Sequence, residues 1–362
     1  MTPSTEDVTG ARRSRSSQRS PKDAMEETVA TTDQTFTRPR YRASRSKLDE
    51  IDLRIIELLS GNGRLSTRAV AADTGLTEAT VAARIRSLSE RGILAVTAVL
   101  DWEVAGYARS LWLDVSVDAN KRMVLDVAYD LAAIRGVKSV SVVFGPADLV
   151  VQALCVDEAD IARLLTGSIV SVEGIHEVRS HVILETVQYR FEQGTIGMGP
   201  SADTIWLPAP AVELDDLDAR IIRTLVDNGR QSNRAIGRDL GVSETTVRVR
   251  LRRLEEAGLL RIVAQSDTYR TRVTRSVAWV WIDVRAGGVR QVAQALAAMP
   301  EVSIVQILDG QHDLIAIVAT PSRGQLVSVV NKQIRPLPGV ASTSTWEIAE
   351  NVSSISQWVR FV

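Results

Sequence analysis

The stretch LDDLDARIIRTLVDNGR at residues 214–230 decides the fold, because it repeats LDEIDLRIIELLSGNGR at residues 48–64. Residues 48–101 can be laid over residues 214–267 without a gap, and about half of the positions are identical. Self-similarity at a fixed separation indicates repeated structural units. The sequence therefore predicts that one small module occurs twice in the chain.

A second pair of similar segments follows the two copies of this module. WLDV at residues 112–115 matches WIDV at 281–284, and GPADL at 145–149 matches GQHDL at 310–314. We therefore expect a tail, then two different modules, a linker, and the same two modules again. The predicted boundaries are 1–47, 48–104, 105–190, 191–212, 213–269 and 270–362. The linker segment is rich in Gly, Pro and small residues, as domain boundaries tend to be.

Composition and charge are those of an ordinary globular protein. Of the 362 residues, 45% are hydrophobic and 24% are charged, and the formal net charge is −1. Any surface that binds nucleic acid must therefore be a local patch. Cys155 is the only cysteine, which excludes an intrachain disulfide and a cysteine zinc site and favours the reducing cytoplasm. No apolar run approaches the roughly 20 residues of a membrane span, so we expect no membrane partner.

Residues 1–47 differ from the rest of the chain. They are rich in Ser, Thr and Arg and contain almost no aliphatic clusters. Such a segment cannot bury enough apolar surface to offset the entropy of ordering it. We predict a disordered basic tail. Its cations suit contact with DNA phosphates, but a solvated tail is the favoured interpretation.

Each copy of the first module has the signals of three helices. A capping side chain precedes each predicted helix of the first copy, and a glycine marks the turn between the last two: Asp49, Ser66, Gly75 and Thr77. The equivalent residues of the second copy are Asp215, Ser232, Gly241 and Ser243. Two helices joined by a short turn containing Gly form a helix-turn-helix unit.

The third predicted helix of the second copy, SETTVRVRLRRLEE at residues 243–256, has an apolar and a cationic face. At about 100° per residue, Val247, Leu251 and Leu254 share the face that should pack on the other helices. The residues predicted to point away from those helices are Thr245, Val249, Arg252 and Arg253. An α-helix fits the major groove of DNA, where Arg reads guanine and Thr contacts bases or a thymine methyl.

Both helix-turn-helix modules are therefore predicted to bind double-stranded DNA. The candidate contacts of the first copy are Ser66, Arg68, Thr77, Ala79, Thr80, Ala83, Arg84 and Arg86. Those of the second copy are Ser232, Arg234, Ser243, Thr245, Thr246, Arg248, Val249, Arg250, Arg252 and Arg253. A basic helix face is usually only solvated, but here the caps, turn and spacing occur twice, which favours DNA binding.

Arg84 and Arg250 have two interpretations. They lie only about 60° from the buried stripe of their helices. An ion pair with an acid of the first helix, such as Asp52 or Asp218, is therefore as well supported as a phosphate contact.

The two copies differ in the charge of the third helix. The first copy has Ala82 and Ala83 where the second has Arg248 and Val249, and the second carries more arginines overall. Because Arg neutralises DNA phosphates, we predict that the second copy supplies more of the phosphate affinity.

The second module alternates strand-like and helix-like patterns. The predicted strands are 107–117, 137–145, 149–156 and 175–187, and the predicted helices are 123–134 and 157–170. This βαββαβ order is that of the ferredoxin-like unit, and its copy runs over 276–351. We predict an α+β chain in which two helix-turn-helix (winged-helix-like) domains alternate with two ferredoxin-like βαββαβ domains.

This arrangement resembles the Lrp/AsnC (feast/famine) transcription regulators. The resemblance rests on the LDxxDxxII start of the helix-turn-helix and the Gly-x-x-Asp turn of the βαββαβ module, and it covers Leu48 to about Asn351. It implies DNA binding by the first module, and dimerisation and sensing of an amino acid or another small molecule by the second. It also implies a homo-oligomer. Members usually carry one copy per chain, so the tandem form departs from the family pattern.

The resemblance further implies effector contacts at the Gly-x-x-Asp turns and on the last strands. The implied residues of the first copy are Gly145, Asp148, Arg179, Ser180 and His181. Those of the second copy are Gly310, Asp313, Ser342, Thr343 and Ser344. Turn amides can hold a carboxylate and Asp can hold an ammonium, although Asp and Gly in hairpin turns more often serve turn geometry.

A fused pair of copies suggests why the module is repeated. A regulator reads a DNA site of two-fold symmetry with two heads, which a homodimer normally supplies. We expect the two βαββαβ modules to pair within the chain as a pseudo-dimer. Because fused heads can diverge, this hypothesis predicts a DNA site with unlike halves.

Two other functions remain open. Sirohaem decarboxylases have a similar architecture and use His and Arg near a bound tetrapyrrole, but His176, His181 and His312 form no constellation in the sequence. No catalytic arrangement, metal-ligand spacing or phosphate-binding glycine loop is visible, so we expect no enzyme, metal or cofactor. The remaining alternative is a DNA-compacting protein with little sequence preference.

Overall fold

The computed structural model describes residues 48–190, 205–266, 274–354 and 357–362. The predicted tail 1–47 and the linker residues 191–204 lie outside the described residues. The described end of the predicted linker packs on the second helix-turn-helix core through Ile205, Trp206, Leu207 and Val212.

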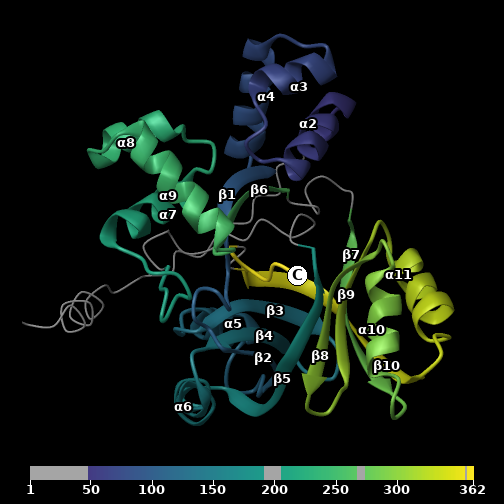
Figure 1. The fold of residues 1–362 in the computed structure, drawn as a ribbon. Helices are drawn as coiled ribbons and strands as arrows, with labels where there is room; N and C mark the ends of the chain where they lie inside the picture. Colours follow the sequence, from purple (N-terminus) through teal and green to yellow (C-terminus); the bar gives the residue numbers. More distant parts are fainter. Residues whose placement is uncertain (1–47, 191–204, 267–273, 355–356) are drawn as a thin grey trace, which may run out of the picture. The chain divides into compact units, whose positions relative to one another are not determined.

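Each copy of the helix-turn-helix module consists of three helices, as predicted (Figure 1). They are α2 (Glu50–Gly61), α3 (Thr67–Thr74) and α4 (Glu78–Glu90) in the first copy, and α7 (Asp216–Asp227), α8 (Asn233–Leu240) and α9 (Glu244–Glu256) in the second. Every one begins after its predicted capping residue, whose side chain accepts a backbone N–H from the first turn. Gly75 and Gly241 adopt the left-handed conformation at the turn, with φ of 71° and 73°.

A strand that the sequence analysis missed follows each helix-turn-helix. β1 (Leu94–Asp101) and β6 (Leu260–Ser266) pair antiparallel, with Leu94 opposite Ser266 and Leu100 opposite Leu260. The short strand β11 (Trp358–Val359) then pairs parallel to the other side of β1. One small sheet therefore joins the first copy, the second copy and the C-terminal segment.

Pairing of β1 with β6 exchanges packing partners between the copies. Helix α2 contacts β6 of the second copy, and α7 contacts β1 of the first. The core of the first helix-turn-helix accordingly includes Ala264 beside Ile55, and the core of the second includes Ala98 beside Ile221. Each helix-turn-helix thus buries its first helix against the strand of the other copy.

The two βαββαβ modules have the predicted element order. The first contains β2 (Arg109–Val117), α5 (Val124–Ala132), β3 (Val137–Phe144), β4 (Leu149–Cys155), α6 (Glu158–Arg163) and β5 (Ile175–Tyr189). The second contains β7 (Ser276–Val284), α10 (Val289–Ala297), β8 (Val302–Asp309), β9 (Leu314–Thr320), α11 (Arg323–Val329) and β10 (Val340–Ser354). A π-helical turn extends α6 and α11: η1 (Leu164–Ser168) and η4 (Val330–Ile334).

The strands of both modules close one barrel. Four strands in the order β3-β4-β2-β5 continue across the β5–β8 pair into β8-β9-β7-β10, and β10 pairs with β3 to close the ring. Helices cover its outer face, with α5 on β3 and α10 on β8 (Figure 1). The two modules therefore pair within the chain along two seams, β5–β8 and β10–β3.

Tryptophans fill the interior of the barrel. Trp112, Trp279, Trp281 and Trp346 share one buried cluster, and the rings of Trp112 and Trp279 lie 4.4 Å apart. The indole Nε1 of Trp112 donates to Gln306 Oε1 of the other module at 2.7 Å, so its burial leaves no unmet polar group. Trp112 and Trp281, which occupy equivalent places in the two copies, thus pack between them.

The exchanged strands leave no room for a side chain at Gly63 or Gly229. A Cβ atom would lie 2.8 Å from the carbonyl carbon of Val263 in the first case and 2.9 Å from the amide nitrogen of Thr97 in the second. Because backbone has to shift, we predict that Gly63→Ala and Gly229→Ala each lower the free energy of unfolding by about 2 kcal/mol.

Urea unfolding followed by circular dichroism measures this loss. Gly167→Ala in η1 is the matched control, because an added Cβ there meets no atom within 4 Å. We expect the control to be neutral or slightly stabilising. Equal losses at Gly63 and Gly167 would contradict the exchanged packing.

Candidate functional site

The outer face of α9 is cationic and solvent-exposed. Val247, Leu251 and Leu254 are buried, as predicted. The exposed residues of the helix include Thr245, Arg248, Val249 and Arg252. Val249 exposes 61% of its surface. An apolar side chain among exposed arginines suits contact with a thymine methyl beside phosphates and guanines.

Two other predicted arginines of α9 are held by acids of α7. Arg250 Nη1 lies 2.6 Å from Asp215 Oδ2 and 3.0 Å from Asp218 Oδ1, and Arg253 Nη2 also bonds Asp218. The Arg250 guanidinium holds the pKa of the Asp215 carboxyl below its ordinary value. Asp218 is almost fully buried, and a buried carboxylate requires such partners. Arg253 therefore turns toward α7, whereas the sequence analysis predicted that it points away.

The equivalent helix of the first copy, α4, exposes less charge. Arg84 Nη1 lies 2.8 Å from Asp49 Oδ2 and 2.7 Å from Asp52 Oδ1, which is the ion-pair interpretation of this residue. The exposed positions of α4 include Ala79, Thr80, Ala83 and Arg86. Phosphate contacts by Arg84 and Arg250 stay a prediction, while the structure gives both a role in holding the helix-turn-helix together.

The remaining predicted DNA contacts lie at the N-terminal ends of the second and third helices of each helix-turn-helix. Ser66 and Ser232 cap α3 and α8, and Arg68 and Arg234 in the first turns of these helices are exposed. Thr77 and Ser243 likewise cap α4 and α9, and their hydroxyls lie 2.9 Å and 2.8 Å from those of Thr80 and Thr246. These side chains cap their helices, and contacts with DNA phosphates at the helix ends stay a prediction.

Reciprocal arginines bind the two helix-turn-helix units to each other. Arg64 donates to the carbonyl oxygens of Gly229 at 3.0 Å and Gln231 at 3.1 Å. Arg230 donates to those of Gly63 at 3.0 Å and Leu65 at 3.1 Å. Burial lowers the pKa of both guanidinium groups from the ordinary value. This contact was not predicted, although both arginines follow Asn-Gly at equivalent places in the repeat.

The Gly-x-x-Asp turns occur where predicted, and their aspartates hold the turns. Asp148 Oδ2 accepts the backbone N–H of Val117 at 2.7 Å, and Asp313 Oδ2 accepts that of Val284 at 2.7 Å. Each carboxylate thus ties its turn to the end of a neighbouring strand. Effector contacts by these aspartates stay a prediction.

Each turn also faces the last strand of the other copy. A Cβ atom at Gly145 would lie 2.6 Å from Trp346 Cγ, and one at Gly310 would lie 2.7 Å from His181 Nδ1. His181 and Trp346 occupy equivalent places on β5 and β10. Glycine at the turn is therefore needed for close approach between the two copies.

Two of the three histidines, His181 and His312, meet at the Gly310 turn, whereas the sequence predicts no constellation of histidines. His181 Nε2 lies 2.9 Å from Asp114 Oδ2, and His312 Nδ1 lies 2.7 Å from Asp283 Oδ1. The two imidazole centroids are 6.0 Å apart and both rings contact Trp281. His181 is fully buried, and its Nδ1 has no hydrogen-bond partner. Only closure of the barrel brings these strands together, so the sequence held no signal for the cluster.

The other implied effector residues lie on the last strands with partners of their own. Arg179 and Ser180 are exposed on β5, and Arg179 Nε pairs with Glu177 at 2.9 Å. On β10, Ser342 bonds Asp283 and so joins the histidine cluster. Thr343 and Ser344 accept hydrogen bonds from Arg335 at 2.8 Å and from Trp346 at 2.7 Å. Of the implied residues, His181 thus lies against Gly310, and Ser342 joins their cluster through Asp283 and His312.

Among the residues that the structure describes, no three or more His, Cys, Asp or Glu side chains are placed to hold a metal ion. In the same part of the chain, no helix has the length and hydrophobicity to span a membrane.

Known proteins share both modules. The AsnC-type helix-turn-helix domain matches residues 48–89 and 214–255, and the Lrp/AsnC ligand binding domain matches residues 112–192 and 277–355. The HTH-type transcriptional regulator FL11 of Pyrococcus horikoshii is 35% identical over 145 residues, which is 39% of this chain and 93% of that protein. An uncharacterized HTH-type transcriptional regulator of the same organism is 32% identical over 147 residues, covering 41% of this chain and 90% of its own length.

A solved structure covers most of the tandem arrangement. The crystal structure of the siroheme decarboxylase NirDL has a TM-score of 0.59, with 16% identity, over 84% of this chain and 93% of that chain. At this identity the likeness concerns the fold alone. The four domain matches together span more than half of the present sequence. This chain therefore belongs to the Lrp/AsnC family of transcription regulators, with both family domains present twice.

Proposed function

We propose that this protein regulates transcription by binding a DNA site with unlike halves, in response to a small molecule of which an amino acid is the favoured class. The observation that carries the proposal is the pair of capped, outward-facing helices α4 and α9 in one chain. Their apolar sides are buried, so only the polar sides are available to a groove of DNA.

The two helices present different chemistry to DNA. Helix α9 exposes Arg248 and Arg252, which suit guanines and phosphates. Helix α4 exposes Ala79 and Ala83 and only Arg86 as a comparable cation, which suits thymine methyl groups. Because the two helices present different side chains, we expect each to select a different half-site sequence.

We place the effector where the two βαββαβ modules meet. Support comes from the turns at Gly145 and Gly310, each of which lies against the last strand of the other copy. A ligand there would contact both modules and could change how they pair. We further propose a homo-oligomer built on the intrachain pair, a cytoplasmic location with access to chromosomal DNA, and no enzymatic role.

We predict that the second copy supplies more of the phosphate affinity. Fluorescence anisotropy with a DNA duplex measures how steeply log K falls with log salt. Arg248→Ala combined with Arg252→Ala should make this slope less steep by about 2, and Arg86→Ala by about 1. Arg290→Ala on α10, whose side chain pairs with Glu185, is the control and should leave the slope unchanged. Equal changes for Arg86→Ala and the double variant would refute the prediction.

Selection from a random duplex library tests the unlike halves. We expect a site whose two halves differ in sequence, and a variant with Ala79→Thr, Ala82→Arg and Ala83→Val should make the halves alike, because α4 then presents the residues of α9. Two identical halves for the parent protein would contradict divergent reading. Equal competition by random DNA would instead support the DNA-compacting alternative.

Sirohaem decarboxylation is the second candidate, and the meeting of His181 with His312 is the observation that favours it. The fold shared with NirDL is compatible with this function. Visible absorbance on adding sirohaem provides the measurement. A spectral shift that Asn replacement of His312 abolishes would support the enzyme, whereas an unchanged spectrum, the outcome we expect, would exclude it.

A further inference from the structure

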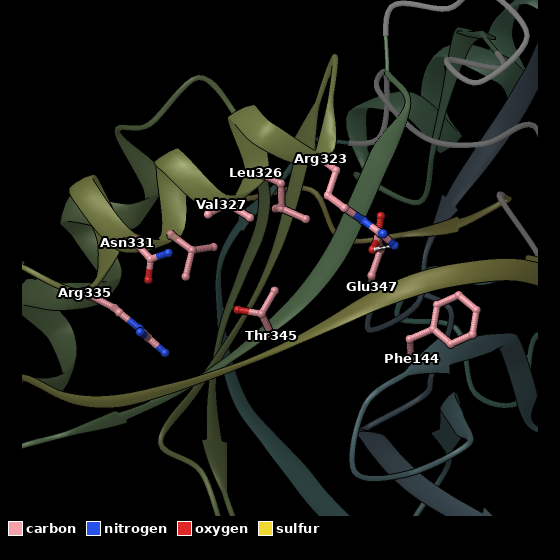
Figure 2. A pocket seen from close by; sticks show the side chains of 9 residues that line it. Phe144, Arg323, Leu326, Val327, Asn331, Arg335, Thr345 and Glu347 are labelled. Carbon is pink, nitrogen blue, oxygen red and sulfur yellow. Dashed lines mark hydrogen bonds and ion pairs between the residues drawn. The ribbon is translucent and has the colours of Figure 1, made fainter.

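A groove lies on the outer face of the barrel at the seam between the two modules (Figure 2). It has a volume of about 360 Å³ and runs between α11, η4 and β10. Phe144 at the end of β3 closes one end, and the pairing of β10 with β3 places it opposite Glu347. The volume is at the lower end of the range for small-molecule sites. None of the residues implied as effector contacts lines this groove.

The middle of the groove is apolar. Leu326, Val327 and Val330 line it from the helical side. Val327 exposes 52% of its surface and Phe144 exposes 66%. Large apolar side chains left in water at the rim of a hollow favour a ligand with a hydrocarbon body.

One end of the groove has an available cation. Arg335 donates through Nε to Thr343 Oγ1 at 2.8 Å, and its two terminal nitrogens have no protein partner among the described residues. Asn331 lies next to it at the same end (Figure 2). A guanidinium whose two terminal nitrogens are free is suited to a carboxylate, which accepts two parallel hydrogen bonds from them.

The other charges of the groove are already satisfied. Glu347 pairs with Arg323 through one carboxylate oxygen and accepts the Ser276 hydroxyl at 3.0 Å through the other. No lining carboxylate is therefore left for an ammonium group. With two arginines and one glutamate, the groove carries a net positive charge, which disfavours a cationic ligand and favours a monoanion.

The first copy lacks these groups at the equivalent positions. Alignment of the helix caps Asp157 and Ser322 places Glu158 at the position of Arg323 and Val170 at the position of Arg335. The charge that would hold an anion is thus a property of the second copy alone.

We propose that this groove binds a small monocarboxylate with an apolar body and no ammonium group. Its carboxylate lies on Arg335 and Asn331, and its hydrocarbon part covers Val327 and Val330 toward Phe144. The site goes beyond the proposed regulatory function, because it depends neither on DNA binding nor on the turns at Gly145 and Gly310.

Isothermal titration calorimetry of the full chain with three related probes tests the proposal. The probes are 3-phenylpropanoate, phenylalanine and 3-phenylpropanol, which share a phenyl body and differ in carboxylate and ammonium. We expect binding of 3-phenylpropanoate and at least about tenfold weaker binding of the other two. 3-Phenylpropanol has no carboxylate for Arg335, and phenylalanine brings an ammonium group for which the groove has no partner.

Variants locate the binding. Arg335→Gln should weaken 3-phenylpropanoate binding at least about tenfold, and Arg335→Lys should have an intermediate effect because it keeps the charge but loses the paired donors. Lys332→Gln, an exposed cation of η4 outside the groove lining, is the control and should bind as the parent does. Circular dichroism verifies that the variants are folded.

Three outcomes would overturn the proposal. The first is no heat of binding for 3-phenylpropanoate at millimolar concentration. The second is equal binding of phenylalanine, which would remove the ammonium-free class. The third is unchanged binding by folded Arg335→Gln, which would place the ligand elsewhere. Because none of these measurements involves DNA, their failure is distinct from a failure of the regulatory function.

Discussion

Antiparallel pairing of β1 with β6 is the constraint on which the helix-turn-helix units depend. Each unit has only three short helices, and a core of that size needs a further apolar surface to cover its first helix. The strand of the other copy provides that surface, with Ala264 in one core and Ala98 in the other. Arg64 and Arg230 add hydrogen bonds across the same contact. Helices α4 and α9 are therefore parts of one cooperative structure and do not belong to two independently folded units.

The barrel solves a similar problem for the βαββαβ modules. A four-stranded sheet has one face for its helices, and its other face and its edges need a partner. Here the faces of the two sheets that carry no helices meet around Trp112, Trp279, Trp281 and Trp346. The edges of the sheets pair along both seams. The helix-turn-helix units and the βαββαβ modules are thus both completed by contacts between the copies.

Local features were predictable from the sequence because they depend on neighbouring residues. The caps from Asp49 to Ser243, the turn glycines Gly75 and Gly241, and the strands and helices of both modules lie where propensity and periodicity put them. The β1–β6 pair was missed because its partner residues are far apart along the chain. The same holds for the histidine cluster and for Arg253, whose direction is set by the buried carboxylate of Asp218. The groove at Arg335 was also beyond reach, since it depends on how α11 and η4 pack on β10 and on Phe144 of the paired strand β3.

Close approach of Gly145 to Trp346 and of Gly310 to His181 has an evolutionary consequence. In a symmetric pair of identical chains, one substitution alters both equivalent turn-to-strand contacts at once, so the two contacts must remain chemically alike. A single polypeptide removes that coupling. Trp346 faces one turn and His181, paired with Asp114, faces the other, so the two equivalent places already differ in chemistry and each can change without the other.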